Sequence, residues 1–254
     1  MMKQQTAAKL RKMNMGAMVD AAESIDGRSA GMAKEDWLEI LVDHLYEERM
    51  SNRVTNSIRA AHLPCPDACV EDLITDSERR LDLGLIDSLA ACTYITRGRD
   101  VVIMGAAGAG KSWLASALGV SACRRLFRVE CVNMLEMCDE LAILRQTPDA
   151  HARRLKQLRN RQLLIVDDWL LRETGQDAVD ELFAVVDARN KTRHSTIVCT
   201  QYTIEGWPQR MGGYPAAESI VDRIRNNSYK VLLQGDKSMR ERCMGDDIRR
   251  QRAD

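Results

Sequence analysis

The sequence predicts an α/β fold in which a parallel five-stranded sheet lies between helices, preceded by a small α-helical domain. After residue 97, five short runs rich in Val, Ile and Leu alternate with helical stretches, at positions 101–105, 128–134, 163–168, 195–201 and 229–235. The first run also leads directly into a glycine-rich loop that opens a helix. This strand–loop–helix order is typical of phosphate-binding proteins.

The first part of the chain is predicted to be helical. Between 34 and 63, apolar residues recur with the period of an α-helix, and two acidic residues support the first turn. A second helix is expected from Ser77 to Ile95. We therefore divide the chain into a helical domain at 1–68, an α/β domain at 69–242 and a disordered tail at 243–254.

The composition limits the class of protein. Apolar residues make up 45% of the chain, and the formal net charge is zero. No apolar run approaches the ~18 residues of a membrane span, and Met1 is not followed by a signal peptide. Eight scattered cysteines then predict a reduced, cytoplasmic protein without structural disulfides. His62, Cys65 and Cys69 leave a weak zinc alternative, and Cys69 is expected instead to be a small core residue.

The stretch GAAGAGKS, Gly105 to Ser112, matches the phosphate-loop pattern G-x-x-x-x-G-K-[ST] in full. Glycines let backbone N–H groups turn inward onto phosphate, and the helix N-terminus adds positive potential. Lys111 is expected to reach the β- and γ-phosphates, and Ser112 to offer its hydroxyl to Mg²⁺. The expected nucleotide contacts of this segment are Gly105, Ala106, Ala107, Gly108, Ala109, Gly110, Lys111, Ser112 and Trp113.

Polar residues end the predicted buried strands at 163–168 and 195–201. Two carboxylates follow the apolar run LLIV at the end of a buried strand. Burying such charges costs free energy unless they bind an ion or a water. Asp167 is expected to hold Mg²⁺ through water, and Asp168 to orient or polarise the water that attacks the γ-phosphate. Many such ATPases carry the longer glutamate at the second position, so slow hydrolysis is expected. Thr200 and Gln201 could sense the γ-phosphate or position the water, and an ordinary polar strand end is the alternative.

A basic run at 151–161, HARRLKQLRNR, contains no acidic residue. On a short helix it fits sequence-independent contact with the phosphates of duplex DNA. A solvated helix face is at least as good an interpretation. Only 4% of the residues are aromatic, so base stacking on single strands is not indicated. The expected contacts are Arg153, Arg154, Lys156, Arg159 and Arg161, with Lys9, Arg11, Lys12, Arg124, Arg125 and Arg128 as further candidates.

The order of these motifs resembles the AAA+ ATPases of the IstB-like group. The segments that carry the resemblance are GAAGAGKSWLASALG, LLIVDDW, STIVCTQ and VDRIRNNSYKVLLQGDKSMR, with CVEDLITDSERRLD and LAACTYI upstream. This group comprises ATP-binding helper proteins of bacterial insertion sequences and is related to helicase loaders of the DnaC type. The resemblance covers roughly residues 35–242 and implies an AAA+ P-loop ATPase domain.

The resemblance also implies how such a protein works. ATP would bind at the interfaces of a homo-oligomer that assembles as a ring or helix on duplex DNA. The assembly would deform the DNA and present it to the transposase of the same element. The N-terminal helical region would contact the transposase or a neighbouring subunit.

The resemblance implies roles for individual residues. The phosphate loop matches Walker A, the LLIVDD strand matches Walker B, and Thr200 with Gln201 falls at sensor 1. Arg223 matches the arginine finger that reaches the ATP of an adjacent subunit, and a solvated or ion-paired helix arginine is the alternative. Arg240 falls at sensor 2.

Two departures from the family pattern concern loop shape rather than chemistry. Leu170 stands where the family usually has glycine, and Tyr202-Thr203 stands where it usually has Leu-Pro.

Two other functions remain open. A DnaC-like helicase loader would grip a replicative helicase through its N-terminal region and favour single strands. A small-molecule P-loop kinase fits less well, because the late arginine helix indicates oligomeric regulation rather than a substrate pocket. The sequence therefore favours an ATP- and Mg²⁺-dependent regulator of transposition that binds duplex DNA and a transposase.

Overall fold

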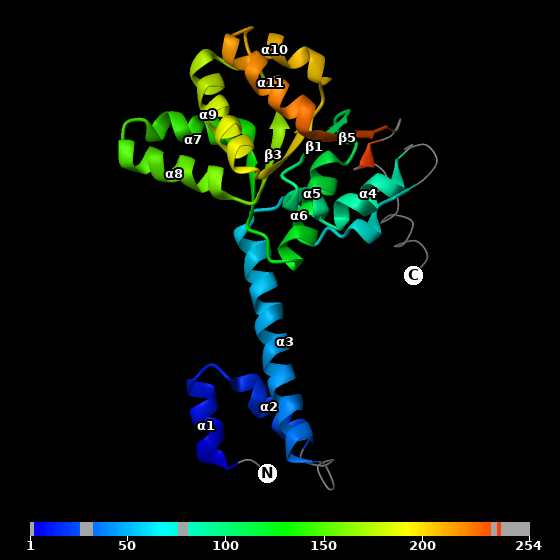
Figure 1. Ribbon diagram of the computed structural model, residues 1–254, viewed down its shortest axis with the longest axis vertical. Coiled ribbons are helices and arrows are strands. Elements are labelled where there is room, and N and C mark those ends of the chain that lie inside the picture. The colour runs from blue at the N-terminus through cyan, green and yellow to red at the C-terminus, as the bar shows by residue number, and fades with distance from the viewer. Residues whose placement is uncertain (1–2, 26–32, 76–80, 235–237, 240–254) are drawn as a thin grey trace, which may run out of the picture. The chain divides into compact units, whose positions relative to one another are not determined.

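The computed structural model describes residues 3–25, 33–75, 81–234 and 238–239 (Figure 1). The expected tail at 243–254 and the sensor 2 candidate Arg240 lie outside these residues.

The chain divides into two compact units, Met1–Asn56 and Ser57–Asp254. The division falls inside helix α3, Lys34–Ala60, whereas the sequence suggested residue 68. The segment after Asn56 packs with the sheet: the Cys131 N–H donates to the Ala61 carbonyl at 2.7 Å.

The first unit consists of three helices among the described residues: α1, Gln4–Lys12; α2, Gly16–Ile25; and α3. One face of α2 packs on α3 through a small core of Ala21, Ala22, Ile25 and Leu41. The helix predicted between 34 and 63 is thus confirmed, and it ends at Ala60.

The second unit contains a parallel five-stranded sheet in the order β2-β3-β4-β1-β5. The strands are β1, Asp100–Gly105; β2, Val129–Asn133; β3, Leu163–Trp169; β4, Ser195–Thr200; and β5, Ser228–Leu233. Each coincides with one of the five apolar runs, so the predicted α/β fold class is confirmed.

Helices cover both faces of this sheet (Figure 1). Alternate strand residues enter different cores: Val101 and Ile103 pack toward α6, whereas Val102 packs toward α9 and α11. On the first face lie α4, Leu83–Ala90; α5, Thr93–Thr96; and α6, Lys111–Arg124. On the second lie α7, Met134–Leu144; α8, Pro148–Asn160; α9, Gln176–Thr192; α10, Trp207–Arg210; and α11, Pro215–Asn227. Burial on both faces explains the nearly continuous apolar strand sequences.

The single helix expected from Ser77 to Ile95 is wrong. The described part of this segment forms two short helices, α4 and α5, separated at Cys92, whose φ is +60°. This left-handed residue breaks the helical hydrogen-bond pattern, and the apolar spacing of the sequence did not reveal it.

The described cysteines form neither disulfides nor a metal-binding group. Cys69 is half-buried rather than a core residue, and its thiol donates to Glu71 at 2.6 Å. Seven described cysteines carry free thiols, and the described residues contain no group of three or more potential metal ligands. No helix in the described ranges is both long and apolar enough to cross a membrane.

Candidate nucleotide-binding site

A cavity of about 870 Å³ opens beside the phosphate loop. The loop and the first turn of α6 form one wall, and Asp168 and Gln201 reach it from the ends of β3 and β4. The loop side is lined by Ala107, Gly108, Gly110, Lys111, Ser112 and Trp113. Six of the nine residues predicted to contact nucleotide therefore line this cavity, whereas Gly105, Ala106 and Ala109 do not.

Glycines shape the phosphate loop. Gly108 and Gly110 have φ of +76° and +90°, a region that side chains with a Cβ rarely adopt. At Gly105 the reason is close approach, because a Cβ there would lie 2.6 Å from the Leu233 carbonyl oxygen of β5. The glycines of the motif are thus required by the backbone path of the loop.

Lys111 lies within the curl of the loop. Its ammonium donates to the carbonyl oxygens of Gly105 at 2.9 Å and Ala106 at 2.8 Å. Burial lowers the pKa of Lys111, and the carboxylates of Asp167 and Asp168 act in the opposite direction. The charge of Lys111 is therefore held at the centre of the loop, between the backbone and the end of β3.

A segment close to the C-terminus packs on the same loop. The Met239 N–H donates to the Gly108 carbonyl at 2.9 Å, and Met239 lines the cavity. A Cβ at Gly108 would collide with Ser238. Ser238 and Met239, the two residues before the sensor 2 candidate Arg240, thus contact the phosphate loop.

Asp167 and Asp168 point in different directions. A bulge between Val166 and Trp169 interrupts the pairing of β3 with β4, and Asp168 has a φ of +53°. Asp168 faces the cavity, whereas Asp167 faces a neighbouring polar cavity of about 670 Å³. The Asp168 carboxylate accepts a hydrogen bond from the Asn133 side-chain amide at 3.0 Å. Asn133 was not anticipated from the sequence.

The oxygen donors near the loop suit Mg²⁺. This ion prefers hard oxygen ligands and commonly takes one or two from the protein, with phosphates and waters completing the octahedron. Ser112 and Asp168 offer such donors in the cavity, whereas Asp167 is the next residue but faces the neighbouring cavity. Within the described ranges there is no group of three or more potential metal ligands. The donor set therefore fits a nucleotide-bound Mg²⁺ rather than a dedicated metal centre.

The two sensor 1 candidates differ in position. Thr200 is 1% exposed, and its hydroxyl donates to the Trp169 carbonyl at 3.2 Å while accepting from the Tyr202 N–H. Gln201 is exposed and lines the cavity. Thr200 thus joins the ends of β3 and β4, and Gln201 is the member that can reach a ligand.

The backbone at Leu170 has a conformation that suits the glycine usually found at this position of the family pattern. Its φ is +55°, in the left-handed region that favours glycine, although its side chain is only 1% exposed. Arg210 donates to the Leu170 carbonyl at 2.7 Å and stacks over the Tyr202 ring at 3.8 Å. Arg210 therefore contacts both positions, 170 and 202, at which the chain departs from the family pattern.

The opposite wall of the cavity was not predicted to bind a ligand, although its residues 72–74 belong to the segment CVEDLITDSERRLD. It consists of 64–68 and 72–74, which precede α4. The Cys65 N–H donates to the Ser116 hydroxyl at 3.3 Å, and this bond ties the wall to α6. The prolines at 64 and 66 predict an extended segment here. They do not indicate that this segment lines a ligand-binding cavity.

Comparison with known proteins places the chain in a family. The model of the IstB-like ATP binding proteins matches residues 6–245. The chain belongs to the IstB-like family. It is 31% identical to the insertion sequence ATP-binding protein y4uH of Sinorhizobium fredii, over 95% of this chain and 97% of that protein. It is 32% identical to the ATP-binding protein of insertion sequence IS1162 from Pseudomonas fluorescens, over 79% and 87% of the two chains.

Solved structures share the fold of this IstB-like protein. The DnaC helicase loader aligns with a TM-score of 0.56 at 17% identity, over 66% of this chain and 97% of that one. The replication initiator DnaA bound to AMPPCP and single-stranded DNA aligns with a TM-score of 0.59 at 18% identity, over 74% and 56%. The second unit of this IstB-like chain therefore has the AAA+ fold of DnaC and DnaA.

Arg223 of the IstB-like chain lies on α11 and contacts α9. Its guanidinium donates to Asp187 at 2.8 Å and to the Ser219 carbonyl at 2.9 Å, and it lies 5.2 Å from the centre of the Phe183 ring. The side chain is 29% exposed. The sequence offered no obvious acidic partner, because Asp187 is far away in the chain.

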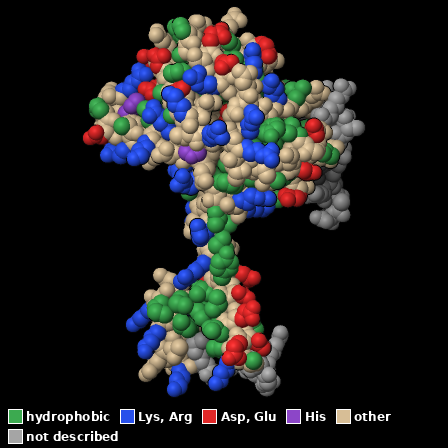
Figure 2. All heavy atoms as spheres, viewed as in Figure 1, with side chains coloured by type: hydrophobic (Ala, Val, Ile, Leu, Met, Phe, Trp, Pro, Cys, Tyr) green, Lys and Arg blue, Asp and Glu red, His purple; other side chains and the backbone are tan. Residues whose placement is uncertain are grey.

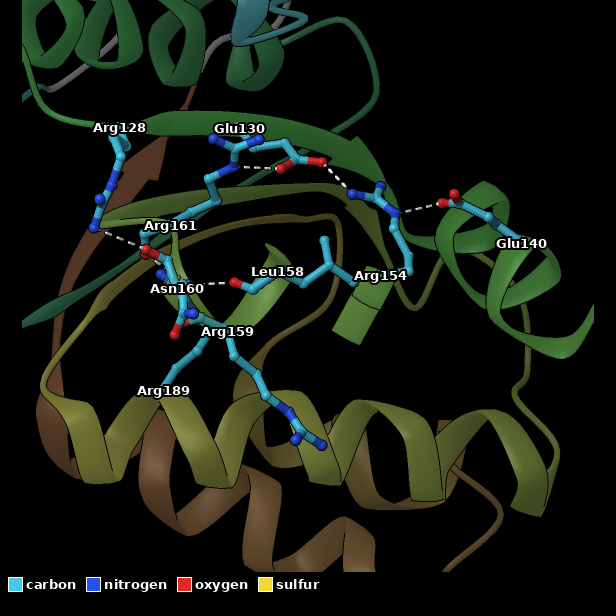
Figure 3. Close-up of polar contacts among 9 residues, drawn as sticks. All are labelled: Arg128, Glu130, Glu140, Arg154, Leu158, Arg159, Asn160, Arg161 and Arg189. Atoms are coloured by element: carbon cyan, nitrogen blue, oxygen red, sulfur yellow. Dashed lines mark hydrogen bonds and ion pairs between the residues drawn. The ribbon is translucent and has the colours of Figure 1, made fainter. Parts of the chain in front are cut away.

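The basic run of this IstB-like protein lies mostly on α8, and Arg161 directly follows that helix. Two of its arginines are engaged by one acid (Figure 3): Arg154 and Arg161 donate to different oxygens of Glu130 at 2.5 and 2.6 Å. Arg154 also donates to Glu140 at 2.8 Å. Burial raises the pKa of Glu130, but the hydrogen bonds of the two arginines outweigh it and lower the pKa overall.

The remaining members of the run differ in exposure. Arg153 and Lys156 are exposed, whereas Arg159 is half-buried. Arg189, which is 1% exposed, holds the end of α8 by donating to the Leu158 and Arg161 carbonyls at 2.6 and 2.8 Å (Figure 3). Burial lowers the pKa of Arg189 to about 10, so it stays charged at neutral pH.

Proposed function

We propose that this IstB-like protein is an ATP-dependent regulator of DNA transposition. It assembles on duplex DNA in the cytoplasm and activates or directs a partner transposase. Relatives named as insertion sequence ATP-binding proteins, matched over nearly the whole chain, support this function. The observation that carries the ATP-dependent part is the cavity in which the phosphate loop, Asp168 and Gln201 meet.

In this proposal the cavity binds ATP with its phosphates on the loop. Backbone N–H groups and Lys111 hold the β- and γ-phosphates. Ser112 would hold Mg²⁺ with its hydroxyl, and Asp167, which faces the neighbouring cavity, would hold it through water. The ion would neutralise phosphate charge. Asp168 accepts a hydrogen bond from the attacking water and orients it, with Gln201 beside it. Because Asp168 is one methylene shorter than the glutamate common at this position, hydrolysis is slow and suits a switch, and the Asn133 amide orients the Asp168 carboxylate.

In this proposal Arg223 completes the ATP site of a neighbouring subunit. Arginine keeps its charge and matches phosphate oxygens with its planar fork. Its partner Asp187 also pairs with Lys191 at 2.7 Å, so Asp187 keeps a cation when Arg223 turns away. In the assembly, Arg223 contacts the ATP of a neighbouring copy, and hydrolysis loosens that contact.

The proposed DNA contact is narrower than the whole basic run. Arg154 and Arg161 neutralise Glu130, so they add little net charge for phosphate binding. Arg153 and Lys156 are exposed and carry no ion pair within the described chain. These two side chains on α8 are the main phosphate contacts in this proposal, and binding is largely independent of sequence.

The test is the mass of the protein mixed with a duplex of about fifty base pairs, a length that leaves room for several subunits. We expect a large complex with ATP and none with ADP. Arg223→Ala should remove the large complex, whereas Arg225→Ala should keep it. Arg225 is the matched control, because it lies on the same helix and, among the described residues, pairs only with the exposed Glu205 at 3.7 Å. A monomer on DNA in every condition would refute the assembly and favour a helicase loader.

A further inference from the structure

Arg223 is held within its own chain by a contact between two helices. Helices α9 and α11 pack side by side on one face of the sheet (Figure 1). One terminal nitrogen of the Arg223 guanidinium donates to the Asp187 carboxylate at 2.8 Å, and the other donates to the Ser219 carbonyl at 2.9 Å. An arginine binds phosphate oxygens with the same nitrogens. The contact with Asp187 and a contact with phosphate therefore compete for one group.

The ion pair is partly shielded from water. The side chains of Arg223 and Asp187 are 29% and 18% exposed, and the Phe183 ring lies 5.2 Å from the guanidinium. Figure 2 shows more Lys and Arg than Asp and Glu side chains on the visible face of the second unit, and such surroundings favour an ionised carboxylate at 187. The pKa of Asp187 is lowered, chiefly by the hydrogen bond from Lys191 and also by that from Arg223, while burial acts in the opposite direction.

Lys191 gives Asp187 a second cation. Its ammonium lies 2.7 Å from the carboxylate oxygen that Arg223 does not use, and it is one helical turn farther along α9. The Lys191 side chain is 73% exposed, so its flexible stem can follow the carboxylate. When Arg223 leaves, Asp187 is therefore not left as an unpaired charge. The ion pair with Arg223 can open at a moderate free-energy cost.

The two helices do not need this ion pair in order to pack. Val185 of α9 and Ile220 and Ile224 of α11 are at most 3% exposed and belong to one apolar core. Burial of such side chains stabilises the contact by far more than a partly exposed ion pair does. Arg223 can thus change its partner while α11 stays in place.

From this arrangement we infer that Asp187 is a latch, which holds Arg223 within its own chain and so raises the protein concentration needed for ATP-dependent assembly. The inference rests on the proposed contact of Arg223 with the ATP of a neighbouring copy. In the closed state Arg223 pairs with Asp187, and in the open state it contacts the neighbour's phosphate while Lys191 keeps Asp187 paired. ADP offers no γ-phosphate in exchange for Asp187, so the latch stays closed with ADP.

A purely structural ion pair would behave in the opposite way. If Asp187 served to position α11, its loss would disturb the helix that carries Arg223 and would weaken assembly. If Asp187 is a latch, its loss makes Arg223 available and strengthens assembly. The sign of one substitution therefore separates the two roles.

Light scattering of the full-length protein with ATP and a duplex of about fifty base pairs measures the concentration of half-maximal assembly. Asp187→Asn should lower this concentration about fivefold, because the amide keeps the shape of the carboxylate but not its charge. Asp180→Asn is the matched control. It makes the same charge change on the same helix, at an exposed position that forms no ion pair with another described residue. An unchanged or higher concentration in Asp187→Asn, or an equal shift in Asp180→Asn, would overturn the latch.

Lys191→Gln should have the opposite effect. Without the second cation, release of Arg223 leaves Asp187 unpaired, so the concentration of half-maximal assembly should rise about twofold. In the Asp187→Asn background the same substitution should change nothing, because no carboxylate remains to be paired. An equal effect of Lys191→Gln in both backgrounds would show a general loss of positive charge and would contradict its role in the latch.

Urea unfolding without nucleotide or DNA separates the latch from the proposed assembly. A double-mutant cycle of Asp187→Asn and Arg223→Ala should show a coupling of at least about threefold in the unfolding equilibrium constant. Absence of coupling would overturn the latch even if assembly requires Arg223. Assembly that survives Arg223→Ala would instead refute the proposed interface. A wild type that stays monomeric while Asp187→Asn assembles would support the latch, whereas two monomeric proteins would refute both proposals.

Discussion

Asn133 joins the Asp168 carboxylate to the start of helix α7. Its amide donates to Asp168 at 3.0 Å, and its carbonyl oxygen accepts from the Leu135 N–H at 2.9 Å. One side chain at the end of β2 therefore caps a helix and fixes the orientation of a carboxylate on the cavity wall. The two roles use opposite ends of the amide, so they can be separated by substitution.

Asn133→Asp should slow ATP hydrolysis while leaving the fold intact. The aspartate still caps α7 with an oxygen, but it replaces the donor to Asp168 by a like charge. We expect kcat to fall by about tenfold, which is ~1.4 kcal/mol of barrier, with unchanged ATP affinity. Single-turnover hydrolysis and a binding titration measure the two effects.

Asn133→Ala is the companion variant, because it removes both roles. It should lose about 1 kcal/mol of unfolding free energy through the missing cap. Wild-type hydrolysis by Asn133→Asp would mean that the hydrogen bond does not position Asp168.

Gly108→Ala should disrupt the phosphate loop. The position has a φ of +76°, and a Cβ there would collide with Ser238. We expect a loss of about 1–3 kcal/mol of stability and a large loss of ATP affinity, measured by thermal unfolding with and without ATP. Gly206→Ala is the control, because a Cβ there meets nothing within 4 Å and the backbone is helical. Normal ATP affinity in Gly108→Ala would contradict the assigned backbone path.

Glu130→Gln should destabilise the second unit by about 3 kcal/mol at neutral pH. Glu130 is 5% exposed and accepts from two arginines, so neutralising it leaves both cations without their partner. Urea unfolding of both proteins measures the difference. A loss below about 0.5 kcal/mol would place this cluster with ordinary surface ion pairs.

The same cluster predicts a pH dependence. The pKa of Glu130 is lower in the folded protein than its usual value near 4.5. Its contribution is therefore fully present above pH 4.5 and is lost as the pH falls through the lower folded value. Wild type and Glu130→Gln should thus converge in stability as the solution is acidified below pH 4.5. A difference that stays constant with pH would contradict this linkage.

Removal of the two exposed bases of α8 should weaken DNA binding. We expect Arg153→Ala with Lys156→Ala to reduce affinity for all duplex sequences alike and to lower the salt slope by about two. Arg154→Ala is the contrasting variant, since it removes the same kind of charge from an ion-paired position. It should cost stability more than DNA affinity. An unchanged salt slope in the double variant would assign the DNA contact to another surface.

Much of the fold could be predicted because its signals are local. Five apolar strands and a complete phosphate loop are each readable within a few residues, and the parallel sheet follows from their alternation with helices. The break at Cys92 could not be predicted, because a cysteine with a positive φ leaves no mark in the spacing of apolar residues.

The site was predictable only in part, for a related reason. Lys111, Ser112 and Asp168 belong to motifs, and they do meet at one cavity. Asn133 and the wall at 64–68 come from other elements and carry no motif. The basic run appeared uncompensated because Glu130 lies on β2, more than twenty positions before Arg154. Sequence spacing shows which residues are near along the chain, but it does not show such partners.

Arg189 has a consequence for how α8 behaves as a binding element. Its guanidinium holds carbonyls at the end of α8 and the Thr196 hydroxyl of β4 at once. If the last turn of α8 opened alone, this buried cation would lose the Leu158 and Arg161 carbonyls and keep its acceptors on β4, so we expect the turn to open together with the sheet. Its amides should therefore exchange with solvent as slowly as those of β4. A helix held in this way meets DNA already folded, and its association should show only a small heat-capacity change.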